Sequence, residues 1–94
     1  MDNIHICIAK YRLVIDNSRD DIYIEATKFD DNHEAISWAV RTHGGLVMSK
    51  DGEFSYEPMP SNRDEDFFKQ YRFSSPKEAI SAINIHLKTQ KKQS

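Results

Sequence analysis

Apolar and polar residues alternate along the first third of the chain, a pattern typical of β-strands. The alternation covers residues 4–15, and its apolar face changes side near Ala9 and Lys10, as a β-bulge would allow. A second alternating run covers residues 21–29, and the polar residues between the two runs are typical of a turn. These runs predict two antiparallel strands joined as a hairpin.

A helical pattern follows at residues 31–43. Asp31 and Glu34 have the spacing of a capping box, and Gly44-Gly45 suits the C-terminal end of a helix. The pattern therefore predicts a first helix, with Trp38 about 120° away from its apolar face. The predicted core positions of this helix are Ala35, Ile36, Ala39 and Val40.

The second half of the chain predicts a hairpin, a fifth strand and a second helix. Asp51-Gly52 is a two-residue turn signal, and a hairpin centred on it pairs Val47 with Tyr56. After an irregular stretch at 58–63, alternation over Phe67–Phe73 predicts the fifth strand. A capping box at Ser75, with Pro76 at the first helical position, then predicts a helix that ends near Lys88. The predicted core positions of the last helix are Ala79, Ile80, Ile83 and Leu87.

Together these elements predict an α+β domain, in which an antiparallel sheet of about five strands is covered by two helices in the order β-β-α-β-β-β-α. We expect residues 1–88 to form a single domain and residues 89–94 to form a polar, flexible tail. Residues 28–37 resemble residues 72–81, with Phe, Glu, Ala, Ile and Ser at corresponding positions. This similarity indicates either an internal duplication of a strand–helix unit or two junctions that follow the same capping rules.

Length and charge narrow the function classes. The chain has 94 residues and a formal net charge of −2, so it lacks the basic excess of a dedicated DNA-binding domain. A domain of this size has a modest core and little volume for a deep substrate pocket. Cys7 is the only cysteine, and no apolar run reaches the ~20 residues that a membrane-spanning helix needs. The N-terminal residues lack the basic region of a signal peptide, so we expect a cytoplasmic protein without a membrane span.

Candidate chemistry is sparse. The four histidines and Cys7 have no zinc-site spacing, and Cys7 is predicted to be a buried strand residue rather than a nucleophile. The serines lack a nucleophile-elbow context, and Gly44-Gly45 lacks a phosphate-loop pattern. We therefore expect no enzymatic activity, no cofactor and no metal.

The remaining features are charged clusters, off-face apolar residues and the irregular loop. They predict a non-enzymatic domain that binds a protein partner and acts by occupying a surface of a larger macromolecule. Small inhibitors of host systems from phages and mobile elements are proteins of this type. Loops carry function more often than regular elements, and tryptophan is enriched in interface hot spots. The predicted contact residues are Trp38, Met59, Arg63, Asp64, Glu65, Asp66 and Ile85.

A nucleic-acid-binding accessory protein is the alternative. In the predicted strand Phe67–Phe73, aromatic residues interleave with Lys69 and Arg72, as in platforms that stack bases and contact phosphates. The lysines of the C-terminal tail would add phosphate contacts, and such binding would weaken steeply with salt. For the acidic residues 64–66, the alternative to a contact surface is a solvated turn.

Overall fold

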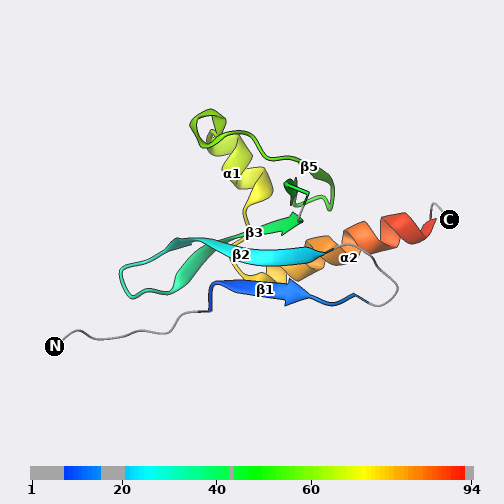
Figure 1. Ribbon diagram of the computed structural model, residues 1–94, viewed down its shortest axis with the longest axis horizontal. Helices are drawn as coiled ribbons and strands as arrows, with labels where there is room; N and C mark the ends of the chain where they lie inside the picture. The colour runs from blue at the N-terminus through cyan, green and yellow to red at the C-terminus, as the bar shows by residue number, and fades with distance from the viewer. Residues whose placement is uncertain (1–7, 16–20, 43, 93–94) are drawn as a thin grey trace.

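One antiparallel sheet and two helices make up the computed structural model, which describes residues 8–15, 21–42 and 44–92 (Figure 1). The five strands lie in the sheet in their chain order, and both helices follow the last strand. The strands are β1 (Lys10–Leu13), β2 (Ile22–Phe29), β3 (Ala35–Thr42), β4 (Leu46–Met48) and β5 (Phe54–Tyr56). A 3-10 turn (Pro60–Asn62) precedes α1 (Glu65–Tyr71) and α2 (Pro76–Lys92). The predicted α+β class, with a five-stranded antiparallel sheet and two helices, is confirmed. The prediction that Cys7 is a buried strand residue concerns a residue outside the described ranges.

The predicted helix at residues 31–43 is wrong, because residues 35–42 form β3. The Oδ1 atom of Asp30 accepts hydrogen bonds from the backbone N–H groups of Asn32 (2.8 Å) and Glu34 (3.0 Å), and His33 adopts a left-handed φ of 64°. The acidic residues therefore close a tight turn between β2 and β3 instead of capping a helix. In β3, the β-branched and aromatic residues Ile36, Trp38 and Val40 alternate with smaller or polar ones, a pattern that a strand accommodates better than a helix.

The predicted strand at Phe67–Phe73 is also wrong, because residues 65–71 form α1. Asp64 is its N-cap and accepts a hydrogen bond of 2.9 Å from the N–H of Phe67. Phe67 and Tyr71 stack with ring centroids 4.9 Å apart, as residues four apart on one helical face can. Aromatic residues at 67 and 71 satisfy both the strand and the helix period, and the N-cap decides between the two. The observed order is therefore five strands followed by two helices.

The β4–β5 hairpin has a longer turn and a different register from the prediction. Leu46, Val47 and Met48 pair with Tyr56, Ser55 and Phe54, one residue away from the expected pairing. The turn spans residues 49–53, where the N–H of Ser49 bonds to the carbonyl of Glu53 and the Ser49 hydroxyl accepts from the N–H groups of Asp51 and Glu53. Gly52 has a left-handed φ of 82°, so the glycine of the predicted turn signal does occupy the turn.

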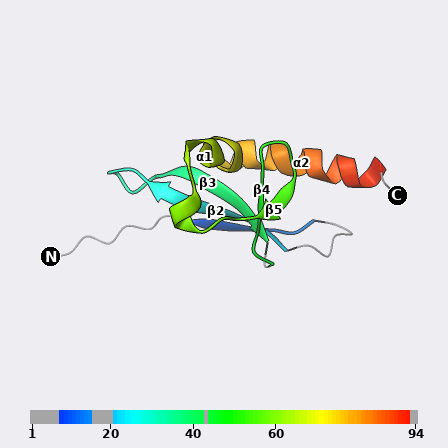
Figure 2. The same cartoon turned by 90° about the horizontal axis from the view of Figure 1, so that it is seen from above.

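The main core lies between the sheet and α2, which runs along one face of the sheet (Figure 2). Its buried members are Ile22, Ile24, Trp38, Val40, Met48, Phe73, Ala79, Ala82 and Ile83. The predicted core positions Ile36 and Ile80 are instead 45% and 44% exposed. The burial of α2 is centred on Ala79, Ala82 and Ile83, which rotates its apolar face away from Ile80. The helix also continues four residues past the predicted end at Lys88.

A second, smaller cluster lies on the opposite face of the sheet. It joins Ala39 and Val47 to Phe67 and Tyr71 of α1. Ala39 alternates with Trp38 and Val40 along β3, so its side chain points away from the main core. Residues 72–75 carry the chain past the edge of β3 from one cluster to the other, and Phe73 forms an isolated bridge with Trp38. The two similar segments, 28–37 and 72–81, thus form a strand–turn–strand and a bridge followed by a helix, so the proposed duplicated strand–helix unit is not found.

Candidate functional site

A groove of about 880 Å³ lies between α1 and the strands β2 and β3, and we call it the β3 groove. Its lining is strongly basic: five cationic residues and a single acidic one, Glu25, border it among the described residues. The basic residues are Lys28, Arg41, Arg63, Lys69 and Arg72. Ile36 and Phe68, which are 45% exposed each, add apolar surface to the lining. On a chain with a net charge of −2, this is a local concentration of positive charge.

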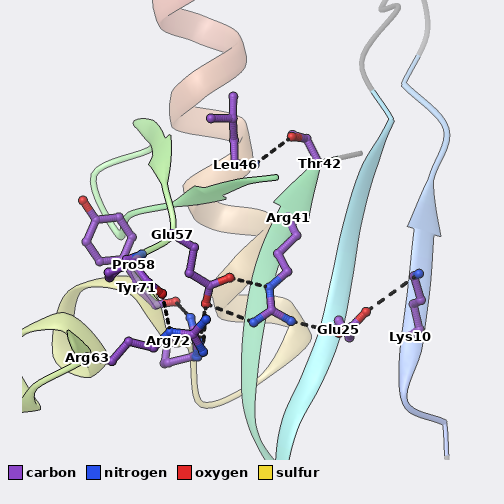
Figure 3. Close-up of polar contacts among 10 residues, drawn as sticks. All are labelled: Lys10, Glu25, Arg41, Thr42, Leu46, Glu57, Pro58, Arg63, Tyr71 and Arg72. Carbon is purple, nitrogen blue, oxygen red and sulfur yellow. Dashed lines mark hydrogen bonds and ion pairs between the residues drawn. The ribbon is translucent and has the colours of Figure 1, made fainter. Parts of the chain in front are cut away.

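Three of the arginines surround the carboxylate of Glu57, which directly follows β5 (Figure 3). Arg41 donates from Nε and Nη2 to the two Glu57 oxygens, at 3.0 Å each. Arg72 donates from Nη2 to Oε2 at 2.6 Å, and Nη1 of Arg63 lies 3.5 Å from the same oxygen. Glu57 therefore links three parts of the chain. It contacts β3 through Arg41, the segment before α1 through Arg63 and the residue after α1, which is Arg72. The paired, fork-to-fork contact with Arg41 is the geometry in which a guanidinium binds a carboxylate most strongly.

The remaining donors of these arginines are also largely used within the protein. Arg41 donates from Nη1 to Glu25 at 2.8 Å, and Glu25 also pairs with Lys10 at 3.8 Å (Figure 3). Arg63 donates from Nε to the carbonyl of Pro58 at 2.8 Å, and Arg72 donates from Nη1 to the carbonyl of Tyr71 at 3.0 Å. The arginines thus build the wall of the groove, and their charges are partly balanced by Glu57 and Glu25.

Burial and pairing act in opposite directions on the ionisation of this cluster. Burial disfavours the charged form of Glu57, but hydrogen bonds from Arg41 and Arg72 outweigh it, so the pKa of Glu57 lies below its usual value. The pKa of Arg41 is raised by its hydrogen bond to Glu57. Burial lowers the pKa of Arg72, whose side chain is 8% exposed, although its bond to Glu57 opposes this effect. An arginine stays protonated throughout the physiological range, so the cluster is an ion network at neutral pH.

Lys28 and Lys69 differ from the arginines, because both are exposed and make no ion pair within the described residues. They extend the lining from β2 and from α1 respectively. Phe68 lies beside Lys69 on α1, and the guanidinium of Arg72 lies 5.7 Å from the centroid of its ring. The ligand-accessible groups of the groove therefore include two lysine ammonium groups and an exposed aromatic ring.

The structure brings only one of the predicted contact residues into the β3 groove. Arg63 lines it, whereas Met59 lies outside the lining and is 70% exposed. Asp64 caps α1, and Glu65 and Asp66 are exposed in the first turn of that helix, where acidic residues complement the helix dipole. Helix capping and the helix dipole thus account for the positions of these three acidic residues.

Neither Trp38 nor Ile85 lines the groove. Trp38 is 5% exposed and belongs to the main core, where its ring packs 5.7 Å from that of Tyr11. The predicted position of Trp38 away from the apolar face assumed a helix, and Trp38 lies in the strand β3 instead. Ile85 lies on α2, is 48% exposed and approaches the β4–β5 turn at Gly52.

The groove residues were only partly visible in the sequence. The predicted basic–aromatic mixture contains Phe68, Lys69 and Arg72, but Phe68 and Lys69 lie in α1 and Arg72 directly follows that helix. The sequence does not indicate Arg41 and Glu57, because they are 16 residues apart and meet only through the pairing of β3 with β4 and of β4 with β5. Nothing in the sequence distinguishes Lys28 from an ordinary exposed residue of a strand.

No group of three or more histidine, cysteine, aspartate or glutamate side chains in the described ranges could hold a metal ion. Within the same ranges, no helix combines the length and hydrophobicity needed to cross a lipid bilayer. Comparison of the chain with models of protein families, with curated proteins and with solved structures gave no match.

Proposed function

We propose that the protein is a non-enzymatic binding domain that holds part of a larger protein in the β3 groove. The observation that carries this proposal is that Lys28 and Lys69, which make no ion pair among the described residues, line one groove together with the exposed ring of Phe68. Apolar side chains with charged groups at their rim are typical of protein interfaces.

The wall of the groove supports this proposal, because ion pairs within the protein hold its arginine side chains in place. Glu57 joins Arg41 of β3 to Arg72 and Arg63 on either side of α1. A preorganised surface loses less conformational entropy on binding than a mobile loop does. The ion pairs of Glu57 therefore favour the groove over the predicted contact residues outside it in this region, which are Met59, Asp64, Glu65 and Asp66.

Affinity capture with matched variants tests the proposal. The tagged parent, a Lys28→Glu/Lys69→Glu double variant and a Lys88→Glu variant are used as baits in lysate of the cells that produce the protein. Lys88 is an exposed lysine of α2 outside the groove lining, so it controls for a change of charge alone. We expect proteins that bind the parent and the Lys88→Glu bait but not the folded double variant. If all three baits retain the same partners, the groove is not the binding surface.

A nucleic-acid-binding function is the second candidate, because Lys69, Phe68 and Arg72 lie together on the wall of the groove. Binding of a single-stranded oligonucleotide that weakens steeply with salt and is lost in the double variant would favour it.

A further inference from the structure

We propose that a second copy of this chain docks in the β3 groove through the acidic tip of its β2–β3 hairpin, residues 29–35. Each copy would place its tip in the groove of the other, so that the contact closes as a twofold-symmetric dimer. The proposal does not depend on the proposed function, because it needs no protein other than this chain. Two observations carry it: opposite charges on separate parts of the chain, and a hairpin that projects away from its own groove.

The tip of the β2–β3 hairpin is an acidic and exposed projection. The hairpin extends beyond both helices (Figure 1 and Figure 2). Residues 29–35 contain the carboxylates of Asp30, Asp31 and Glu34 and no lysine or arginine. Asp31 and Glu34 are exposed and make no ion pair within the described ranges. Phe29 is 43% exposed, so the tip presents an aromatic ring as well as carboxylates.

The β3 groove is complementary to this tip in charge and in apolar surface. Its described lining has five cationic residues and one carboxylate, that of Glu25. If Glu57, which pairs with the arginines, is counted too, five positive charges face two negative ones, which leaves a net charge of +3. Ile36 and Phe68 add exposed apolar surface, which would cover the ring of Phe29 from a second copy. Complementary potentials of this kind select a partner and fix its orientation.

The tip cannot reach the groove of its own chain. Lys28 and Ile36 line the groove and lie at the base of the hairpin, where the β2–β3 pairing shifts register. The tip continues outwards from this base and is closed by the hydrogen bonds that Asp30 accepts. Folding back would break the pairing of Phe29 with Ala35. The complementary charges therefore meet only when two molecules associate.

A reciprocal contact suits this arrangement of base and tip. When two hairpins lie side by side in opposite directions, the tip of each lies next to the base of the other, where the groove begins. Once one tip is bound, the second contact forms at a high effective concentration. A contact in one direction alone would leave a free tip and a free groove, and would extend into a chain of molecules. The dimer would also compete with any other protein for the groove.

Sedimentation velocity of the full chain tests the proposal. We expect the parent to change from monomer to dimer between about 1 µM and about 1 mM protein. Raising the ionic strength from about 0.1 M to about 1 M should return it to monomer, because the Debye length falls from about 10 Å to about 3 Å. The control Asp51→Lys/Glu53→Lys changes two exposed acidic residues of the β4–β5 turn and should dimerise as the parent does.

Two charge-reversed variants locate the contact. The tip variant Asp31→Lys/Glu34→Lys and the groove variant Lys28→Glu/Lys69→Glu should each be monomeric, because tip and groove then carry charges of the same sign. Mixed in equal amounts, they should form a heterodimer, since each tip then meets a groove of opposite charge. Circular dichroism shows that each variant is folded, and the single variants Asp31→Lys and Lys69→Glu replace a double variant that does not fold.

The outcomes separate the two proposals. A parent that stays monomeric at about 1 mM would overturn the dimer and leave the proposed function standing, because affinity capture does not need a dimer. A parent dimer that both variants retain, or a mixture of the variants that stays monomeric, would also overturn it, because the interface would then lie elsewhere. A dimer with the expected behaviour, and no captured protein that depends on the groove, would contradict the proposed function alone.

Discussion

Trp38 and Phe73 donate a backbone hydrogen bond to each other, at 2.8 Å in both directions, and this bridge joins the two sides of the molecule. Phe73 enters the main core beneath α2, whereas the preceding residue, Arg72, turns to Glu57 at the wall of the β3 groove. Adjacent residues of one segment thus belong to the packing of α2 and to the candidate site. The shape of the groove therefore depends on how the main core is packed.

Trp38 is expected to be a core residue rather than a contact residue. Trp38→Ala should lower the free energy of unfolding by about 3–5 kcal/mol, because a buried aromatic side chain leaves a large cavity. Tyr56→Ala, at an aromatic residue that is 82% exposed, should change it by no more than about 0.5 kcal/mol. Denaturant melts of both variants make the comparison, and equal stabilities would show that Trp38 does not anchor the core.

Substitutions in α2 should follow the observed burial and not the predicted face. Ile83→Ala should cost about 2–5 kcal/mol, because Ile83 is 3% exposed, whereas Ile80→Ala at 44% exposure should cost less than about 1 kcal/mol. Ser75→Ala removes the hydroxyl that accepts from the N–H of Glu78 at 3.2 Å and should cost about 0.5–2 kcal/mol. Chemical denaturation gives the order, and a larger loss for Ile80→Ala than for Ile83→Ala would contradict this packing of α2.

Gly45 and Gly52 have the same φ of 82°. Replacing each of them by alanine therefore separates the cost of backbone strain from the cost of a steric clash. A Cβ at Gly45 would meet nothing within 4 Å, so Gly45→Ala should cost only the strain, about 1–2 kcal/mol. A Cβ at Gly52 would lie 3.0 Å from the carbonyl oxygen of Ala82 and 3.0 Å from the backbone nitrogen of His86. Because Gly52→Ala should force α2 away from the turn as well, we expect a loss of about 3 kcal/mol or more.

Calorimetry of the two glycine variants tests that difference. The helix is held at this point by Nδ1 of His86, which lies 3.1 Å from the carbonyl oxygen of Gly52. Equal melting temperatures for Gly45→Ala and Gly52→Ala would mean that the β4–β5 turn does not contact α2 closely.

Glu57 should couple stability to pH. Its pKa is lower in the folded protein than in the unfolded chain, so its stabilising effect is fully present above the usual value of 4.5 and is lost as the pH falls through the folded-state pKa. Glu57→Gln should lower the free energy of unfolding at neutral pH by about 3 kcal/mol, because three guanidinium groups lose their carboxylate. The same variant should show less further loss of stability on acidification than the parent.

Denaturant melts from about pH 7 to about pH 3 measure both effects. Glu53→Gln, at an exposed residue of the β4–β5 turn, is the matched control and should follow the parent within about 0.5 kcal/mol. Parallel pH profiles for the parent and Glu57→Gln would show that Glu57 is not the carboxylate responsible.

The sequence predicted those elements in which local pattern and tertiary packing agree. Alternation gave the β1–β2 hairpin, and the capping residue Ser75 gave the start of α2. The helix prediction at residues 31–43 is wrong because an aspartate side chain can either cap a helix or close a β-turn. Asp30 and Asp31 suit both structures equally, and only the pairing of β3 with β2 favours the turn. The predicted register of the β4–β5 hairpin is wrong because the Ser49 hydroxyl accepts two backbone hydrogen bonds that stabilise a longer turn.

The groove was harder to predict than the fold, because its parts are distant in sequence. Glu57 meets Arg41 across two strand pairings, and it meets Arg72 through the packing of α1. No local period marks such contacts. The sequence predicts contacts at Met59 because it lies in a loop and at Asp66 because it is charged. Neither feature indicates which surfaces of the folded protein are concave.

Chemical-shift mapping tests the central claim, that the β3 groove is the binding surface, most directly. A segment of a captured partner is titrated into isotopically labelled protein, and backbone amide resonances are followed residue by residue. The account predicts that the largest shifts fall on the groove lining at Lys28, Ile36, Phe68 and Lys69. Shifts concentrated at Met59, at the acidic residues 64–66 or at Ile85 would contradict it.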